Sequence, residues 1–151
     1  MKKTFLNSFN YNHWANEKII SYFLDTKNLP EKCLDLFSHI ISVQDYWYDR
    51  LVNKNIYLID LWDRYSLLEL TPLNRNSTNT WKDFIKKSSK KSFRNLCGYY
   101  DKKGKPVDIS VADIIHHLLN HSAYHRGQIN LILRENNLEP IDIEFNNYAA
   151  F

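Results

Sequence analysis

Residues 110–137 read SVADIIHHLLNHSAYHRGQINLILRENN, and this stretch carries the clearest helical pattern in the chain. Ser110, with Asp113 three residues later, resembles a capping box, in which a side-chain oxygen accepts a free backbone N–H at the start of a helix. Beyond it, six residues follow one another at steps of four and three, which is the spacing of one packed helix face. The members of this seam are Ile114, Leu118, His121, His125, Gln128 and Ile132. The stretch therefore predicts a long helix packed in a bundle.

Three further stretches show helical patterns. Residues 3–26 carry apolar side chains at helical spacing and end before a proline, and residues 31–52 carry a similar stripe that ends at a polar run. A third helix is expected to begin at Thr78 or Thr80. Thr80 is the better N-cap, because Asp83 follows it three residues later. With the last helix, these patterns predict an all-α fold.

The remaining segments are shorter. Residues 56–79 are less regular, because Pro72 and a polar run interrupt them, and we expect a short helix or a packed loop there. Residues 93–100 and 105–109 flank a glycine turn, so they predict a short β-hairpin directly before the last long helix. The tail, residues 139–151, leaves that helix and is expected to pack across the bundle.

Composition narrows the class of protein. The 151 residues suit one domain spanning residues 1–151, and 44% hydrophobic content supports a real core. Only 3 glycines and 4 prolines exclude collagen and make a turn-rich β-sandwich a poor fit. A net charge of +3 is too small to argue for a nucleic-acid or membrane partner. Lys86, Lys87, Lys90 and Lys91 form a cluster that is best explained as a solvated helix face.

The cysteines and the apolar segments indicate the cellular location of the protein. Cys33 and Cys97 lie far apart in sequence, which excludes a zinc knuckle and favours two reduced thiols. No apolar run approaches the about 18 residues that span a bilayer, and polar residues interrupt the start of the chain where a signal peptide would need an apolar segment. We therefore expect a cytoplasmic protein without a membrane partner.

His121 and His125 are the residues that point to chemistry. Four residues apart on a helix, their β-carbons lie about 5–6 Å apart, and both rings can reach one metal ion at about 2.0–2.1 Å. The alternative is a pair of core histidines satisfied by hydrogen bonds. Two buried imidazoles without partners, however, are costly to desolvate. Ser122 stands where the HExxH pattern has its catalytic glutamate, which argues against a zincin-type protease.

A third ligand is expected from another helix. His39 lies beside the apolar stripe of residues 31–52 and is the best candidate. Three histidines from two helices would leave positions open for water or substrate, which is typical of catalytic metal sites. His13 is a weaker fourth candidate. His117 extends the four-residue series, but each such step rotates about 40° around the helix axis, so three rings do not converge easily.

Three segments together resemble one known family. Residues 117–129 (HLLNHSAYHRGQI) resemble the closing motif of the DinB/YfiT-like family of metalloenzymes. Residues 11–18 (YNHWANEK) are similar to its opening motif, and residues 38–47 (SHIISVQDYW) are similar to its second-helix motif. The three matches occur in the family's order and span most of the chain.

The resemblance implies an up-down four-helix bundle, often dimeric, that holds a divalent ion through three histidines. Carried over by position, these ligands are His39, His121 and His125. The resemblance implies that the ion is nickel or zinc, with other ions as alternatives, and the ligand types do not choose among them. Some relatives transfer low-molecular-weight thiols to electrophiles. The resemblance therefore implies a small-molecule substrate, a possible thiol cofactor, a homodimer, and attack on an electrophile by metal-activated water or thiol.

Several roles stay open on the sequence alone. Gln128, one turn beyond His125, is a candidate to orient water or to hydrogen-bond a ligand, and a core amide satisfied by backbone is an equal alternative. The aromatic residues Trp14, Tyr46, Trp47 and Trp62 suit a substrate pocket, the core or a dimer interface. The alternative to an enzyme is a metal-binding or stress-response bundle whose ion only stabilises the core.

Overall fold

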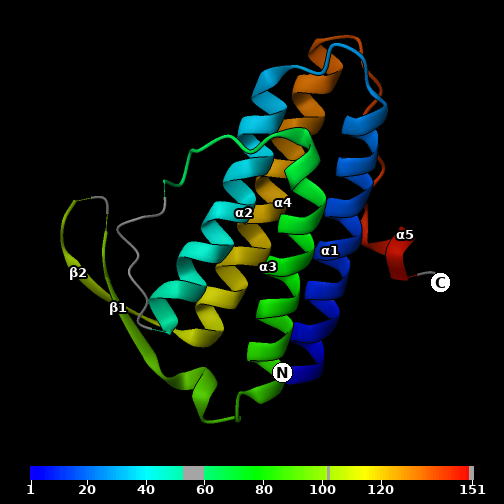
Figure 1. The fold of residues 1–151 in the computed structure, drawn as a ribbon. Helices are drawn as coiled ribbons and strands as arrows, with labels where there is room; N and C mark the ends of the chain where they lie inside the picture. The colour runs from blue at the N-terminus through cyan, green and yellow to red at the C-terminus, as the bar shows by residue number, and fades with distance from the viewer. Residues whose placement is uncertain (53–59, 102, 150–151) are drawn as a thin grey trace.

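A computed structural model describes residues 1–52, 60–101 and 103–149, and four long helices dominate it (Figure 1). These helices are α1 (Lys2–Asp25), α2 (Glu31–Leu51), α3 (Leu67–Lys87) and α4 (Val111–Glu135). The shorter elements are the 3-10 helix Ser92–Arg94, the strands β1 (Leu96–Tyr100) and β2 (Pro106–Ser110), and α5 (Phe145–Ala149). The predicted helical fold and the hairpin before the last long helix are confirmed.

The long helices pack in two antiparallel pairs. α1 lies chiefly against α3, and α2 lies chiefly against α4. Contacts between Ser38 and residue Tyr65 at one end, and between Gln44 and Trp81 further along, show that α2 and α3 run in the same direction. α1 and α4 therefore run one way and α2 and α3 the other (Figure 1). Bundles with such a crossover connection are an established variant of the four-helix arrangement.

The predicted cap of α4 is present. Ser110 Oγ accepts a hydrogen bond from the backbone N–H of Asp113 at 3.1 Å and donates one to the Asp113 carboxylate at 2.6 Å. The strands β1 and β2 pair antiparallel, with Leu96 opposite Ser110, so the hairpin leads directly into this cap. The start of α4, which carries two of the candidate ligands, is thereby fixed.

The prediction for the third helix was wrong at its start. α3 begins at Leu67, because Ser66 and Glu69 form a capping box in which Glu69 Oε2 accepts the Ser66 backbone N–H at 2.8 Å. Pro72 lies only in the second turn and does not end the helix. Residues 60–66 form a packed loop, in agreement with one of the two alternatives, and residues 56–59 lie outside the described residues.

The polar run at residues 74–77, which suggested a loop, lies within α3, where Asn74 and Ser77 face the interior and Arg75 and Asn76 are exposed. Asn74, Ser77 and Thr78 are each at most 2% exposed. A solvated loop and a buried polar helix face have the same composition, so the sequence pattern misled. The consequence is a polar layer inside the bundle where an apolar core would be expected.

This layer separates two apolar clusters. One cluster contains Phe9, Trp81 and Leu118, and the other contains Ile19, Leu70 and Ile129. We call the buried polar residues between them on α1, α3 and α4 the polar belt. Its members are Asn12, Asn16, Asn74, Ser77, Thr78, Ser122, His125 and Arg126. The belt places hydrogen-bonding side chains at the middle of the bundle, where the histidines lie.

The tail packs across the bundle as expected. The Tyr11 hydroxyl donates a hydrogen bond to the carbonyl of Ile143 at 2.7 Å, and the side chain of Asn130 pairs with both backbone groups of Ile141. Cys33 is buried, Cys97 is half-buried, and both are free. None of the described helices combines the length and apolarity needed to cross a membrane.

Candidate metal centre

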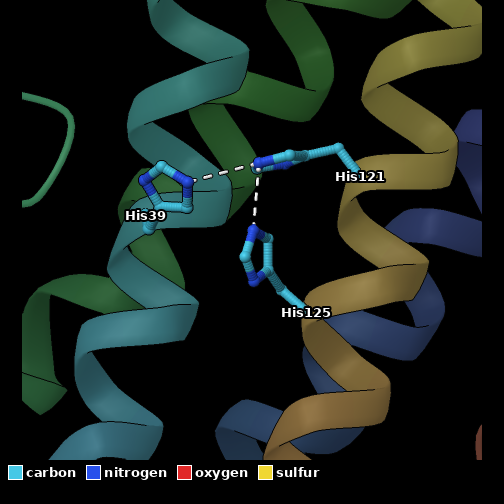
Figure 2. Close-up of side chains that lie close together, drawn as sticks. All are labelled: His39, His121 and His125. Atoms are coloured by element: carbon cyan, nitrogen blue, oxygen red, sulfur yellow. Dashed lines mark hydrogen bonds between the residues drawn. The ribbon is translucent and has the colours of Figure 1, made fainter.

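Three histidines from two helices converge at one point (Figure 2). His39 projects from α2, and His121 and His125 project from successive turns of α4. The Nε2 atom of His121 lies 3.2 Å from Nε2 of His39 and 3.1 Å from Nε2 of His125. Each ring offers a nitrogen within 4.8 Å of the other two. The structure thus brings together the three residues that the sequence nominated as ligands.

Hydrogen bonds fix which nitrogen faces the centre in two of the rings. His39 Nδ1 lies 2.6 Å from the carbonyl oxygen of Leu61, and His125 Nδ1 lies 2.7 Å from Oε1 of Gln128. A carbonyl oxygen only accepts, so each Nδ1 carries the proton and donates it. The Nε2 atoms are left with lone pairs that point toward the same space. A second partner that fixes the imidazole tautomer in this way is typical of metal-ligating histidines.

His121 differs from its two neighbours. Its Nδ1 is buried and has no hydrogen-bond partner among the described residues. Among the described residues, the polar contacts of its ring are those of Nε2 with the other two histidines. The ring of His121 is further held by packing against that of His117, with centroids 5.4 Å apart.

The geometry fits a shared divalent ion. Bonds of about 2.0–2.1 Å to one ion place the ligand nitrogens about 2.9–3.4 Å apart, for angles between 90° and tetrahedral. The separations of 3.2 and 3.1 Å fall within this range. Imidazole suits zinc, nickel, copper and iron alike, so the ligand set does not select the metal. No carboxylate or thiol of the described residues lies close enough to join the three histidines.

The rings are held in the neutral form that binds metals. Burial lowers the pKa of His121 to about 3, and the neighbouring rings of His125, His39 and His117 add to the effect. Burial also lowers the pKa of His39 and of His125, although their hydrogen bonds to Leu61 and Gln128 act in the opposite direction. At neutral pH all three rings are neutral, and the Nε2 lone pairs of His39 and His125 are available.

These lowered pKa values predict acid sensitivity of the metal-free protein. As pH falls through about 6.5, the unfolded chain takes up protons on these histidines, whereas the folded chain resists protonation. The free energy of unfolding should therefore fall from pH 7 to pH 5. Urea unfolding of the metal-free protein measures the free energy of unfolding at each pH. In His121→Gln this free energy should fall less steeply between pH 7 and pH 5. Equal pH dependence in the two proteins would contradict the assignment.

Gln128 acts on the centre through His125. Its Oε1 accepts the Nδ1 proton of that ring, so it is a positioning residue and not a group shown to touch a substrate. Gln128→Leu should weaken metal affinity about 10- to 100-fold. Gln128→Glu keeps an acceptor at the same place and should retain most of the affinity. Competition with a chromophoric chelator measures both, and a leucine variant that binds as tightly as the parent would refute this role.

Two features of the centre were not predicted. The carbonyl of Leu61 is a backbone group, so no side-chain pattern announces it. Trp62 stacks on His39, with ring centroids 3.8 Å apart and an angle of 5° between the planes. It remains 53% exposed, whereas Trp47, another aromatic candidate for the pocket, is buried in the core.

The other candidate histidines lie outside the centre. His13 is on α1, where its Nδ1 lies 3.2 Å from the Asn74 side-chain nitrogen and 4.0 Å from the Glu17 carboxylate. It is therefore not a fourth member of the cluster. His117 is near His121, with ring centroids 5.4 Å apart, and it also packs edge-on against Trp47.

Comparison with known proteins agrees with this fold. Residues 1–150 match the profile of the DinB family. The structure resembles a DinB-like protein from Bacillus cereus ATCC 10987, with a TM-score of 0.56 and 15% sequence identity, over 91% of this chain and 94% of that one. No curated protein matched the chain. On the extent of the family match, this chain belongs to the DinB family.

Proposed function

We propose that this protein is a metal-dependent enzyme whose ion is held by His39, His121 and His125. The ion is nickel or zinc, and the reaction is the attack of water or a low-molecular-weight thiol on a small electrophilic substrate. The observation that carries the proposal is the convergence of three Nε2 atoms, two of them fixed by Nδ1 hydrogen bonds. Three neutral imidazoles whose Nε2 atoms face one another favour a cation at their centre.

The chain's own residues would divide the work. When bound, a divalent ion supplies Lewis acidity that lowers the pKa of a water or thiol beside it. Leu61 and Gln128 hold the proton on Nδ1 of their histidines, which keeps Nε2 free for ligation. Trp62 covers His39, limits the access of bulk water to that ring, and offers an exposed aromatic surface to a substrate.

The competing proposal is a bundle whose ion only stabilises the fold. A structural ion is typically enclosed by four protein ligands, whereas catalytic zinc sites use three and leave a position open. The described residues supply three. This difference favours the enzyme.

A screen of thiols against electrophiles tests the proposal. The metal-loaded protein should show turnover that chelation abolishes and added nickel or zinc restores. His39→Ala should lose the activity, and His13→Ala, which changes a histidine outside the centre, should keep it. Activity that is indifferent to chelation would refute the proposal. Metal binding that raises the melting temperature without turnover would support the structural alternative.

A further inference from the structure

Lys32 lies at the edge of the metal centre. It is seven residues before His39 on α2, which places both on the same face of the helix. Its side chain is exposed, and Nζ lies 5.5 Å from the centroid of the Trp62 ring. Since Trp62 stacks on His39, the ammonium, the indole and the imidazole form a continuous surface. A molecule that reached the three histidines past Trp62 would meet Lys32.

The acidic residues next to Lys32 are already engaged. Asp35, at the i+3 position, would be its usual partner on a helix. Instead, Arg64 binds Asp35 at 2.6 Å and Glu31 at 2.9 Å. Throughout residues 1–52, 60–101 and 103–149, no ion pair of Lys32 is formed. Arg64 thereby leaves one unpaired positive charge beside the exposed indole.

The carboxylate next to Trp62 is engaged as well, because Asp60 Oδ1 accepts the backbone N–H of Trp62 at 2.9 Å. Lys32 is the cation that lies against the indole ring covering His39. A negatively charged group that approached His39 past Trp62 would therefore meet the Lys32 ammonium.

We propose that the molecule bound at this centre carries a carboxylate, which Lys32 binds while Trp62 packs against the intervening part. One unpaired ammonium balances one negative charge, which suits a carboxylate better than a phosphate dianion. This inference rests on the proposed function, because it names the substrate class of the same site. Electrostatic complementarity of this kind selects among ligands and speeds their encounter.

The first test needs no metal. Iodide and caesium are ions of opposite charge that quench the fluorescence of exposed tryptophans. The contribution of Trp62 is the difference between the fluorescence of the parent protein and that of Trp62→Phe. Each quenching constant is divided by that of free N-acetyltryptophanamide, because caesium is intrinsically the weaker quencher. On this scale iodide should quench Trp62 at least about twice as efficiently as caesium at low salt. Lys32→Gln should remove the preference. Lys18→Gln is the matched control, because Lys18 is exposed and lies 4.8 Å from the ring centroid of Trp14 on another helix.

The second test uses the nickel-loaded protein. Mercaptocarboxylic acids with one to three methylenes are compared with their amides, which have nearly the same size and no charge. The best acid should bind about 3- to 10-fold more tightly than its amide. This preference should vanish in Lys32→Gln and persist in Lys18→Gln, while nickel content stays at the parent level in both.

The outcomes separate this inference from the proposed function. Equal quenching by iodide and caesium, or a preference that survives Lys32→Gln, would overturn the inference whether or not metal binds. Equal binding of acids and amides to the nickel-loaded protein would overturn it as well and would leave the enzyme proposal intact. A protein that takes up no nickel but keeps the Lys32-dependent iodide preference would refute the enzyme proposal alone.

Discussion

His121→Ala is expected to lose nearly all bound metal under conditions in which the parent protein retains one ion per chain. His121 is the ring that both other histidines contact through Nε2. Loss of a partner that merely orients a ligand costs about 10- to 100-fold in affinity, so loss of a ligand should cost more than about 100-fold. Elemental analysis after loading with nickel and desalting measures the effect.

His117→Ala is the matched control for this substitution. It removes a neighbouring imidazole on the same helix, one that lies 5.4 Å from His121 between ring centroids and does not belong to the cluster. The control should retain its nickel. Circular dichroism of the metal-free proteins at neutral pH shows whether each variant still folds. Equal metal content in folded His121→Ala and the parent would remove His121 from the ligand set.

Asn74→Ala is expected to lower the free energy of unfolding by about 2–4 kcal/mol. Asn74 accepts a hydrogen bond from Asn16 at 2.9 Å and donates one to Glu17 at 2.7 Å, which ties α3 to α1 inside the polar belt. Alanine leaves the fully buried Nδ2 of Asn16 without this acceptor. Urea unfolding at neutral pH gives the value directly.

Asn76→Ala provides the comparison, because this asparagine lies on the exposed face of the same helix. Its substitution should change stability by less than about 0.5 kcal/mol. The pair also tests the start of α3. If residues 74–77 formed the loop that their composition suggests, the two substitutions would have similar, small effects.

The long helices and the histidine cluster follow from the sequence for a definite reason. Residues four apart on a helix lie on one face, so His121 and His125 must lie close together wherever α4 packs. His39 could be nominated because it sits beside the apolar stripe that orients α2 toward the core. Neither argument needs the tertiary structure, beyond the assumption that the two helices are neighbours.

The features that the sequence did not predict depend on contacts between distant segments, which local patterns do not contain. The polar run at residues 74–77 has the composition of a loop, and the partners of Asn74 on α1 show why it is helical with one side buried. The parallel direction of α2 and α3 depends on the connection between them, residues 52–66. Extended, that segment reaches about 50 Å, which is enough to return along a helix of about 32 Å, but length alone does not require it.

The groups that hold the histidines of the metal centre in place could not be predicted from the sequence either. Leu61 contributes a carbonyl whose position depends on the packed loop of residues 60–66. That loop is itself fixed by the backbone N–H of Tyr65, which donates to Ser38, and by Arg64 on the first turns of α2. The same contacts place Trp62 on His39 and leave Lys32 unpaired. None of these contacts can be inferred from spacing along a single helix.

Anomalous diffraction from crystals grown with nickel locates the ion directly. We expect one strong peak per chain, within about 2.0–2.1 Å of the Nε2 atoms of His39, His121 and His125. Nδ1 of His39 and of His125 should remain on the Leu61 carbonyl and on Gln128. A peak at another site, or three rings without a shared peak at saturating nickel, would contradict a metal centre in this bundle.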